Sequence, residues 1–173
     1  MSRPCAFSQS SRGRSPGFTW IELLAVVTVV AVLALMAIPA MQDSALKRQV
    51  KEGMALADVA KTGVQAFWST AGEMPGNNAA AGIPPRQKIV GVLVKDVNVD
   101  AGAVTLTFGN NASKPLEGKR LTLRPAVVPG ELAVPIAWIC AQVPTPKGME
   151  VRGRDETDIQ PSWLPVECRG KSP

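Results

Sequence analysis

The sequence contains no histidine and only three cysteines in 173 residues. Without histidine there can be no Ser-His or Cys-His nucleophile pair, no histidine-ligated zinc and no histidine proton shuttle. No catalytic constellation is visible among the other residues, so we expect neither enzymatic activity nor a cofactor. Hydrophobic residues make up 46% and charged residues 19%, which excludes a disordered or collagen-like chain and fits one domain with an appendage.

The net charge of +5 is concentrated near the N-terminus. Arg3, Arg12 and Arg14 lie in the first 17 residues, which contain no acid, and the rest of the chain holds 16 basic and 14 acidic groups. This near balance does not indicate a general polyanion binder. Basic clusters in the C-terminal half fit solvated sheet edges and loops. Contact with DNA is the alternative if the chain forms a polymer, because weak charges then repeat many times along it.

An uncharged apolar run follows the basic segment. Residues 23–41 are rich in Leu, Val and Ala and are interrupted only by Thr28 and Pro39. At about 1.5 Å per residue such a helix spans roughly 28 Å, close to the hydrocarbon thickness of a bilayer. Basic residues before the run and none directly after it predict a cytoplasmic N-terminus and an exported C-terminus. A buried core helix is the alternative, but a small domain rarely hides a helix that is apolar on every side.

The helical pattern continues beyond this run. Apolar and small residues recur at a spacing of three and four along one stripe, with charged residues on the other side. We therefore expect one helix from about Phe18 to about Thr70. Small residues in the stripe would let a sheet approach closely, and Pro39 should kink or loosen the helix because it lacks a backbone donor. The stripe comprises Leu46, Val50, Gly53, Ala57, Ala60, Val64, Phe67 and Trp68.

Strands are expected in the remainder of the chain. Gly, Pro and Asn are concentrated in residues 72–85, which indicates a long loop. The order of elements then predicts an α+β fold, in which a long N-terminal helix with a protruding hydrophobic half packs on a four-stranded antiparallel sheet. The expected strands cover residues 89–95, with a bulge or break near Asp96, and residues 104–108, 119–124 and 134–140.

Glu22 is the most informative single residue. A carboxylate at the edge of a membrane-spanning run costs about 2–3 kcal/mol or more to bury. One interpretation is snorkelling to the membrane surface, one turn into a helix whose macrodipole favours an acid. The other is pairing with a cation inside an apolar assembly. Cleavage after Gly17 would create such a cation, the α-amine of Phe18, and a pair between two axially staggered helices would fix their register.

The residues around this acid match a known family. The stretch GFTWIELL at residues 17–24, after a short basic leader and before an apolar run reaching Pro39, resembles the type IV pilin signature. Trp20 departs from it, because the family usually has Leu there. Similarity to bacterial type IVa pilins extends from residue 13 to Cys168. It includes FWS at 67–69, PGNNAAAGI at 75–83, VTLTFG at 104–109, LEGK at 116–119 and IAWIC at 136–140.

The resemblance implies how the chain matures and is organised. A prepilin peptidase would cut between Gly17 and Phe18 and methylate the Phe18 amine. Glu22 would neutralise that amine on a neighbouring subunit, and Pro39 would lie where the helix loosens in the fibre. The implied parts are a removed leader at 1–17, a long helix at 18–70 with membrane anchor and filament core at 23–41, and a globular head at 71–173. Within the head we expect a loop at 71–88, the sheet at 89–140 and a disulfide loop at 140–168.

Removal of the leader would also remove Cys5 and leave an even pair, Cys140 and Cys168, in an exported domain. The segment between them resembles the disulfide-bounded loop of type IV pilins. Closing it should stabilise the fold by about 3–4 kcal/mol in the chain-entropy model. Two free buried thiols are an alternative, and a metal site is a weaker one, because two cysteines without histidine cannot fill a tetrahedral shell.

These observations predict a structural protein. By resemblance, the chain would be a prepilin that is processed at the inner membrane. The inner-membrane assembly machinery would then polymerise it with other copies into an extracellular type IV pilus, or fimbrium. Such filaments serve adhesion, twitching motility and DNA uptake, which leaves weak contact with DNA or a host surface open. Alternatives are a minor pilin or a type II secretion pseudopilin, and an anchored domain that never polymerises. An exported soluble enzyme or binding protein with an ordinary signal peptide is disfavoured, because Ile38-Pro39-Ala40 is a poor cleavage site.

Overall fold

The computed structural model describes residues 17–141 and 143–170, without the side chains of residues 36–40. The chain divides into two compact units between Pro39 and Ala40. Helix α1, Trp20–Ala71, contributes residues to both units.

In the first unit, every described side chain from residue 17 to residue 35 is exposed. The Leu, Val and Ala residues of this part of α1 therefore present apolar surface on every side. The end of the expected anchor at 23–41 includes residues 36–40, whose side chains lie outside the described set. Among the described residues, no helix has both the length and the apolarity that a membrane span requires.

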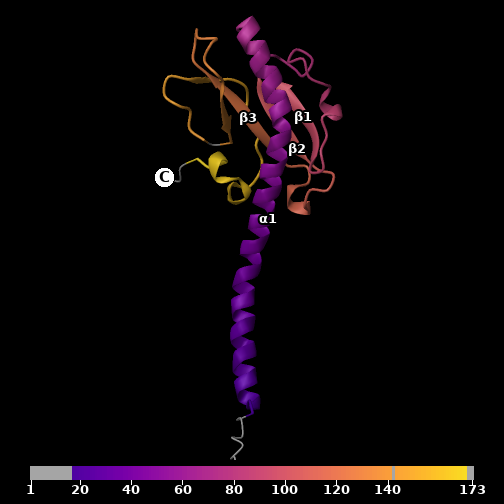
Figure 1. Ribbon diagram of the computed structural model, residues 1–173, viewed down its shortest axis with the longest axis vertical. Helices are drawn as coiled ribbons and strands as arrows, with labels where there is room; N and C mark the ends of the chain where they lie inside the picture. Colours follow the sequence, from indigo (N-terminus) through magenta and orange to yellow (C-terminus); the bar gives the residue numbers. More distant parts are fainter. Residues whose placement is uncertain (1–16, 142, 171–173) are drawn as a thin grey trace, which may run out of the picture. The chain divides into compact units, whose positions relative to one another are not determined.

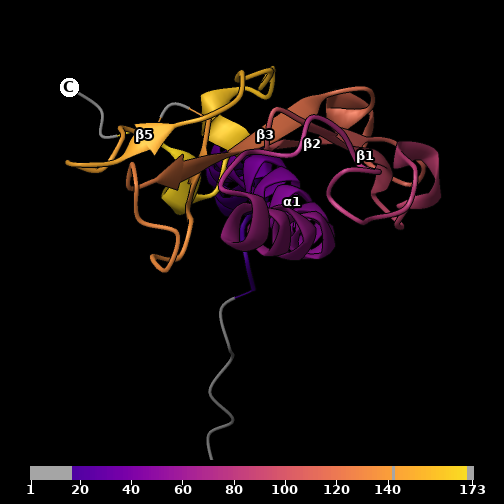
Figure 2. The same ribbon diagram turned by 90° about the horizontal axis from the view of Figure 1, so that it is seen from above.

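In the second unit an antiparallel sheet lies against α1 (Figure 1, Figure 2). The strands run in chain order as β1–β2–β3–β4, and a short β5 pairs with β3. The expected α+β fold is confirmed, with a fifth strand added. The strands are β1 Val94–Asp100, β2 Ala103–Phe108, β3 Arg120–Val127, β4 Ala137–Cys140 and β5 Glu150–Val151. The 3₁₀ helices of the described residues are η1 Arg86–Lys88, η2 Lys114–Leu116, η3 Pro161–Trp163 and η4 Val166–Cys168.

The face of α1 that meets the sheet is the stripe expected from the sequence. A Cβ added at Gly53 would lie 2.5 Å from Phe108 Cε1. One added at Gly63 would lie 2.5 Å from the carbonyl oxygen of Ala81. Real Cβ atoms do not approach so closely, so glycine is required for α1 to pack this near to β2 and to the following loop. The buried members of the stripe are Leu46, Val50, Gly53, Ala57, Ala60, Val64 and Trp68, and Phe67 is half-buried.

Strand β1 begins at Val94, later than the alternation from Ile89 predicts. Just before it, the Gly91 carbonyl accepts a hydrogen bond from Asn110 Nδ2 at 2.9 Å, so this stretch is bonded to the turn after β2 and not to a strand. Within β1, the register against β2 shifts between Val94 and Asp96. The bulge expected near Asp96 is therefore confirmed, whereas the expected strand before Val94 is not formed.

The other strands follow the expected ranges with shifted ends. Strand β3 continues to Val127, because Ala126 and Val127 pair with β5. Strand β4 is confined to four residues and pairs with β3 from Leu123 to Ala126. The pairing of β5 involves only two residues, which is too short for a period-two pattern to be detected.

Residues 72–85, between α1 and η1, form no helix or strand, and Asn78 ties this loop to the sheet. Asn78 Nδ2 donates to the carbonyls of Pro84 and Val97, both at 3.0 Å. Its Oδ1 accepts a hydrogen bond from Val99 N at 2.7 Å. Because Asn78 is only 6% exposed, these bonds satisfy an amide that water does not reach. Composition predicts the loop, but this anchor is visible only in the structure.

Candidate assembly site

Helix α1 begins with a capped turn. Thr19 precedes the helix, and its Oγ1 accepts a hydrogen bond from Glu22 N at 3.3 Å. The Thr19 carbonyl accepts the first helical bond, from Leu23 N at 3.1 Å. Thr and Glu at this spacing are the sequence signature of a capping box. Our sequence reasoning considered Glu22 only as a charge and missed the cap, although the pattern Thr-Trp-Ile-Glu signals it.

The Glu22 carboxylate lies in the first turn of α1, where the partial positive charge of the helix terminus favours an acid. Its side chain is exposed. Within the described part of the chain it belongs to no ion pair shorter than 4.0 Å. A cation on a second molecule could therefore reach the carboxylate without displacing an ionic partner from this chain.

The two residues of the expected cleavage site lie directly before α1. Gly17 and Phe18 are outside regular secondary structure and exposed, with Phe18 at 83%. Exposed, irregular backbone is the kind of segment that proteases cleave most readily. Gly17, Phe18 and Glu22 thus gather at one end of α1, together with the exposed ring of Trp20.

Pro39 lies apart from this group along the sequence. Helix α1 runs through it, and the side chains around it lie outside the described residues. Proline lacks the N–H that would bond to the preceding turn, so a local loosening of α1 at this position stays a prediction.

Comparison with known proteins decides the family. The family model Pilin, described as a bacterial filament, matches residues 47–169. The type IV major pilin protein PilE1 of Neisseria gonorrhoeae is 36% identical over 159 residues, which cover 88% of this chain and 86% of the relative. A fimbrial protein of Neisseria meningitidis serogroup B is 34% identical over 165 residues, covering 90% and 95%. The chain belongs to the pilin family.

The resemblance to type IV pilins, which the sequence motifs of this pilin indicated, is thereby confirmed. A more distant relative, the type IV major fimbrial protein FimA of Dichelobacter nodosus, is 30% identical over 125 residues, covering 61% of the chain and 80% of the relative. These three relatives are named as major pilins or fimbrial proteins, so they do not favour the pseudopilin or soluble-enzyme alternatives.

The expected disulfide of the pilin head is present. Cys140 at the end of β4 and Cys168 in η4 are bonded, with Cα atoms 5.0 Å apart and a sequence separation of 28 residues. Cys168 is fully buried, and its Sγ lies 3.9 Å from Met54 Sδ on α1. The bond therefore holds the C-terminal segment against both the sheet and the helix.

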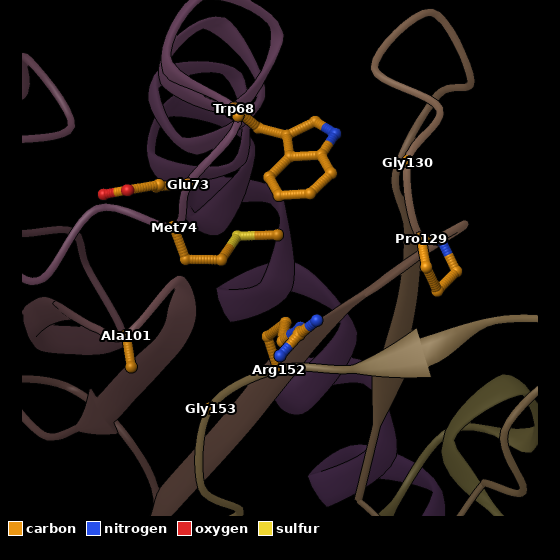
Figure 3. A pocket seen from close by; sticks show the side chains of 9 residues that line it. Trp68, Glu73, Met74, Ala101, Pro129, Gly130, Arg152 and Gly153 are labelled. Carbon is orange, nitrogen blue, oxygen red and sulfur yellow. The ribbon is translucent and has the colours of Figure 1, made fainter.

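The head also contains a hollow of about 450 Å³ at the end of α1 (Figure 3). The Trp68 ring, Met74 and Arg152 contribute to its lining. Arg152 Nη2 is paired with Glu150 Oε2 at 2.6 Å. Trp68 Nε1 has no hydrogen-bond partner in the described structure. Among the described residues no group of three or more Cys, Asp or Glu could hold a metal ion.

Proposed function

We propose that this pilin is the structural subunit of a type IV pilus, made as a prepilin and assembled with identical copies into a helical filament. The observation that carries the proposal is similarity over nearly the whole chain to proteins named as type IV major pilins. The arrangement at the start of α1 supports it, because an exposed acid lies in the first turn close to the exposed residues Gly17 and Phe18, between which we expect cleavage.

Maturation would create the positively charged partner that the Glu22 carboxylate lacks in the single chain. Cleavage between Gly17 and Phe18 by a prepilin peptidase leaves a new α-amine on Phe18, which the same enzyme would methylate. The amine and Glu22 of the same helix are poorly placed to meet, because the amine lies along the helix axis. A neighbouring helix displaced along that axis brings the two charges together and fixes the register.

The apolar half of α1 would lie in the inner membrane before assembly and in the filament core afterwards. Exchange of lipid for the apolar helices of other subunits gains little net apolar burial. Assembly therefore needs the work of an inner-membrane machinery, and registry needs a specific contact, which Glu22 supplies. The finished filament would be extracellular and would serve adhesion, twitching motility or DNA uptake.

The decisive experiment is mass analysis of the mature protein. We expect a chain that begins at N-methylated Phe18 and keeps the Cys140–Cys168 disulfide. A chain that begins near Met41 would identify an exported soluble protein with an ordinary signal peptide, and an intact Met1 would exclude processing. The share of this chain in sheared pili, measured in the same preparation, separates a major from a minor subunit.

A further inference from the structure

Three cations lie on α1 shortly after its apolar run ends at Met41. They are Lys47, Arg48 and Lys51. Lys47 is four residues before Lys51, and Arg48 is three residues before it. On a helix, residues at these spacings are neighbours, so the three side chains share one face. We name this set the basic face of α1.

The basic face lies outside the packed stripe of α1. Leu46 and Val50, which directly precede Lys47 and Lys51, are the buried residues of this stretch. Arg48 and Lys51 are exposed, and Lys47 is half-buried. Figure 2 shows the strands of the second unit on one side of α1. The basic face is therefore accessible to a partner outside this chain.

The chain offers these cations no ionic partner. Within the described residues none of the three belongs to an ion pair shorter than 4.0 Å. Asp43, between them and the apolar run, accepts a hydrogen bond from Trp163 Nε1 at 3.0 Å and is thereby directed toward η3. Residues 44–55 contain the three cations and one acid, Glu52. This part of α1 therefore carries an excess of positive charge.

The position of the basic face matches the headgroup layer of a bilayer that the apolar run enters. At about 1.5 Å per residue, Lys47 lies roughly 9 Å beyond Met41 along α1, and Lys51 roughly 15 Å. The headgroups add roughly 5–8 Å on each side of the hydrocarbon. Helical side chains point back toward the N-terminus, here toward the apolar run, and Lys and Arg extend their charges to the interface. Lys47 and Arg48 therefore reach headgroup phosphates, and Lys51 lies within about a Debye length of them.

An anionic phospholipid fits this arrangement better than a soluble anion does. Arginine binds phosphate through two parallel hydrogen bonds, and lysine binds it as a point charge. Basic residues close to a membrane surface attract anionic lipids, and each adds to the attraction. A phospholipid also joins its phosphate to hydrocarbon, just as α1 joins the basic face to an apolar run. A free phosphate or an acidic protein would match only the first of these two features.

We propose that the basic face of α1 binds anionic phospholipid headgroups in the outer leaflet of the inner membrane, before the subunit is assembled. The bound lipids hold the subunit at a fixed depth, and they are released when it is extracted into a filament. The inference rests on the proposed function, because it places the apolar half of α1 in a membrane. It adds a ligand that the pairing of Glu22 does not require.

Native mass spectrometry of the full chain in detergent tests the proposal. The chain is mixed with equal amounts of phosphatidylglycerol, which is anionic, and phosphatidylcholine, which carries no net charge. We expect the native chain to bind about fivefold more phosphatidylglycerol than phosphatidylcholine, because each cation near the headgroups favours the anionic lipid. K47Q/R48Q/K51Q should bind at least about threefold less phosphatidylglycerol than the native chain.

Two sets of control variants remove the same number of positive charges elsewhere. Three exposed lysines of the head are neutralised in K88Q/K95Q/K147Q, which should keep the native lipid preference. The three arginines of the leader also attract anionic lipid, and R3Q/R12Q/R14Q measures their share. Circular dichroism, together with the mass of the disulfide-bonded chain, shows whether each variant folds.

Two results would overturn the proposal: a native chain without preference for phosphatidylglycerol, or K47Q/R48Q/K51Q with the native preference. The second result would leave the basic face to contacts between subunits. Failure of the proposed function gives a different result, which flotation of the native chain with vesicles of phosphatidylcholine alone detects. These vesicles contain no anionic lipid, so flotation depends on the apolar half of α1. A chain that does not float with them is not anchored by this helix.

Discussion

At Gly53 the main chain of α1 lies against the ring of Phe108 in β2. A methyl group at this position would meet Phe108 Cε1 at 2.5 Å and Cζ at 2.9 Å. Both residues are buried, so the helix or the ring must move. We expect overpacking in Gly53→Ala to cost about 1–3 kcal/mol and a gain of about 1 kcal/mol in helix propensity to offset part of it, so that the free energy of unfolding falls by up to about 2 kcal/mol.

The measurement is urea unfolding of the full chain in detergent, followed by circular dichroism. Gly76→Ala is the control, because a Cβ added there meets nothing within 4 Å. That variant should stay within about 0.5 kcal/mol of the native protein. An unfolding midpoint of Gly53→Ala equal to or above the native one would show that the helix moves away from β2 at little cost.

Among the elements, the C-terminal segment depends most on a covalent bond. Residues 141–168 contain one two-residue strand and two short 3₁₀ helices among those described, so regular hydrogen bonding contributes little. Replacing Cys140 and Cys168 together by Ala should lower the free energy of unfolding by about 3–4 kcal/mol. Cys5→Ser, in the leader that maturation would remove, should leave the mature head unchanged. A double variant as stable as the native protein in the same urea titration would assign the stability to the packing around Met54.

How far the sequence predicts these elements depends on how local the signal is. The buried stripe of α1 repeats every three or four residues, so periodicity alone predicts it from Leu46 to Trp68. The bulge near Asp96 appears as a change of parity between the valines of β1. The valines at 90 and 92 alternate in the same way, yet hydrogen bonds from a distant turn hold them out of the sheet. Alternation cannot distinguish these two cases.

The candidate site was predictable for a different reason. Gly17, Phe18 and Glu22 belong to one short motif, and the structure keeps them together because they are adjacent in sequence. The cap at Thr19 carried a signal that our reasoning did not use. The charge partner of Glu22 has no counterpart among the described residues of one chain, so its identity rests on the chemistry of cleavage and on a second copy.

For the molecule as a whole, one carboxylate is assigned two physical roles. Glu22 occupies the third position of α1, at which the capping-box motif begun by Thr19 places a Glu or Gln side chain. It would also neutralise the amine of the next subunit. The first role needs a hydrogen-bonding side chain at this position, whereas the second needs a negative charge. Substitutions that separate hydrogen bonding from charge therefore separate the two roles.

Glu22→Gln retains a side chain suited to the capping box but has no charge, and Glu22→Ala loses both. If pairing with the Phe18 amine directs assembly, both variants should be cleaved normally and both should form at least about tenfold fewer filaments, because an unpaired amine would be buried in the core. Electron microscopy of sheared material gives the yield, and mass analysis gives cleavage and methylation. Glu22→Asp keeps the charge on a shorter side chain and should retain part of the yield. Normal filaments from Glu22→Gln together with few from Glu22→Ala would show that Glu22 acts by starting the helix and not by pairing with its neighbour.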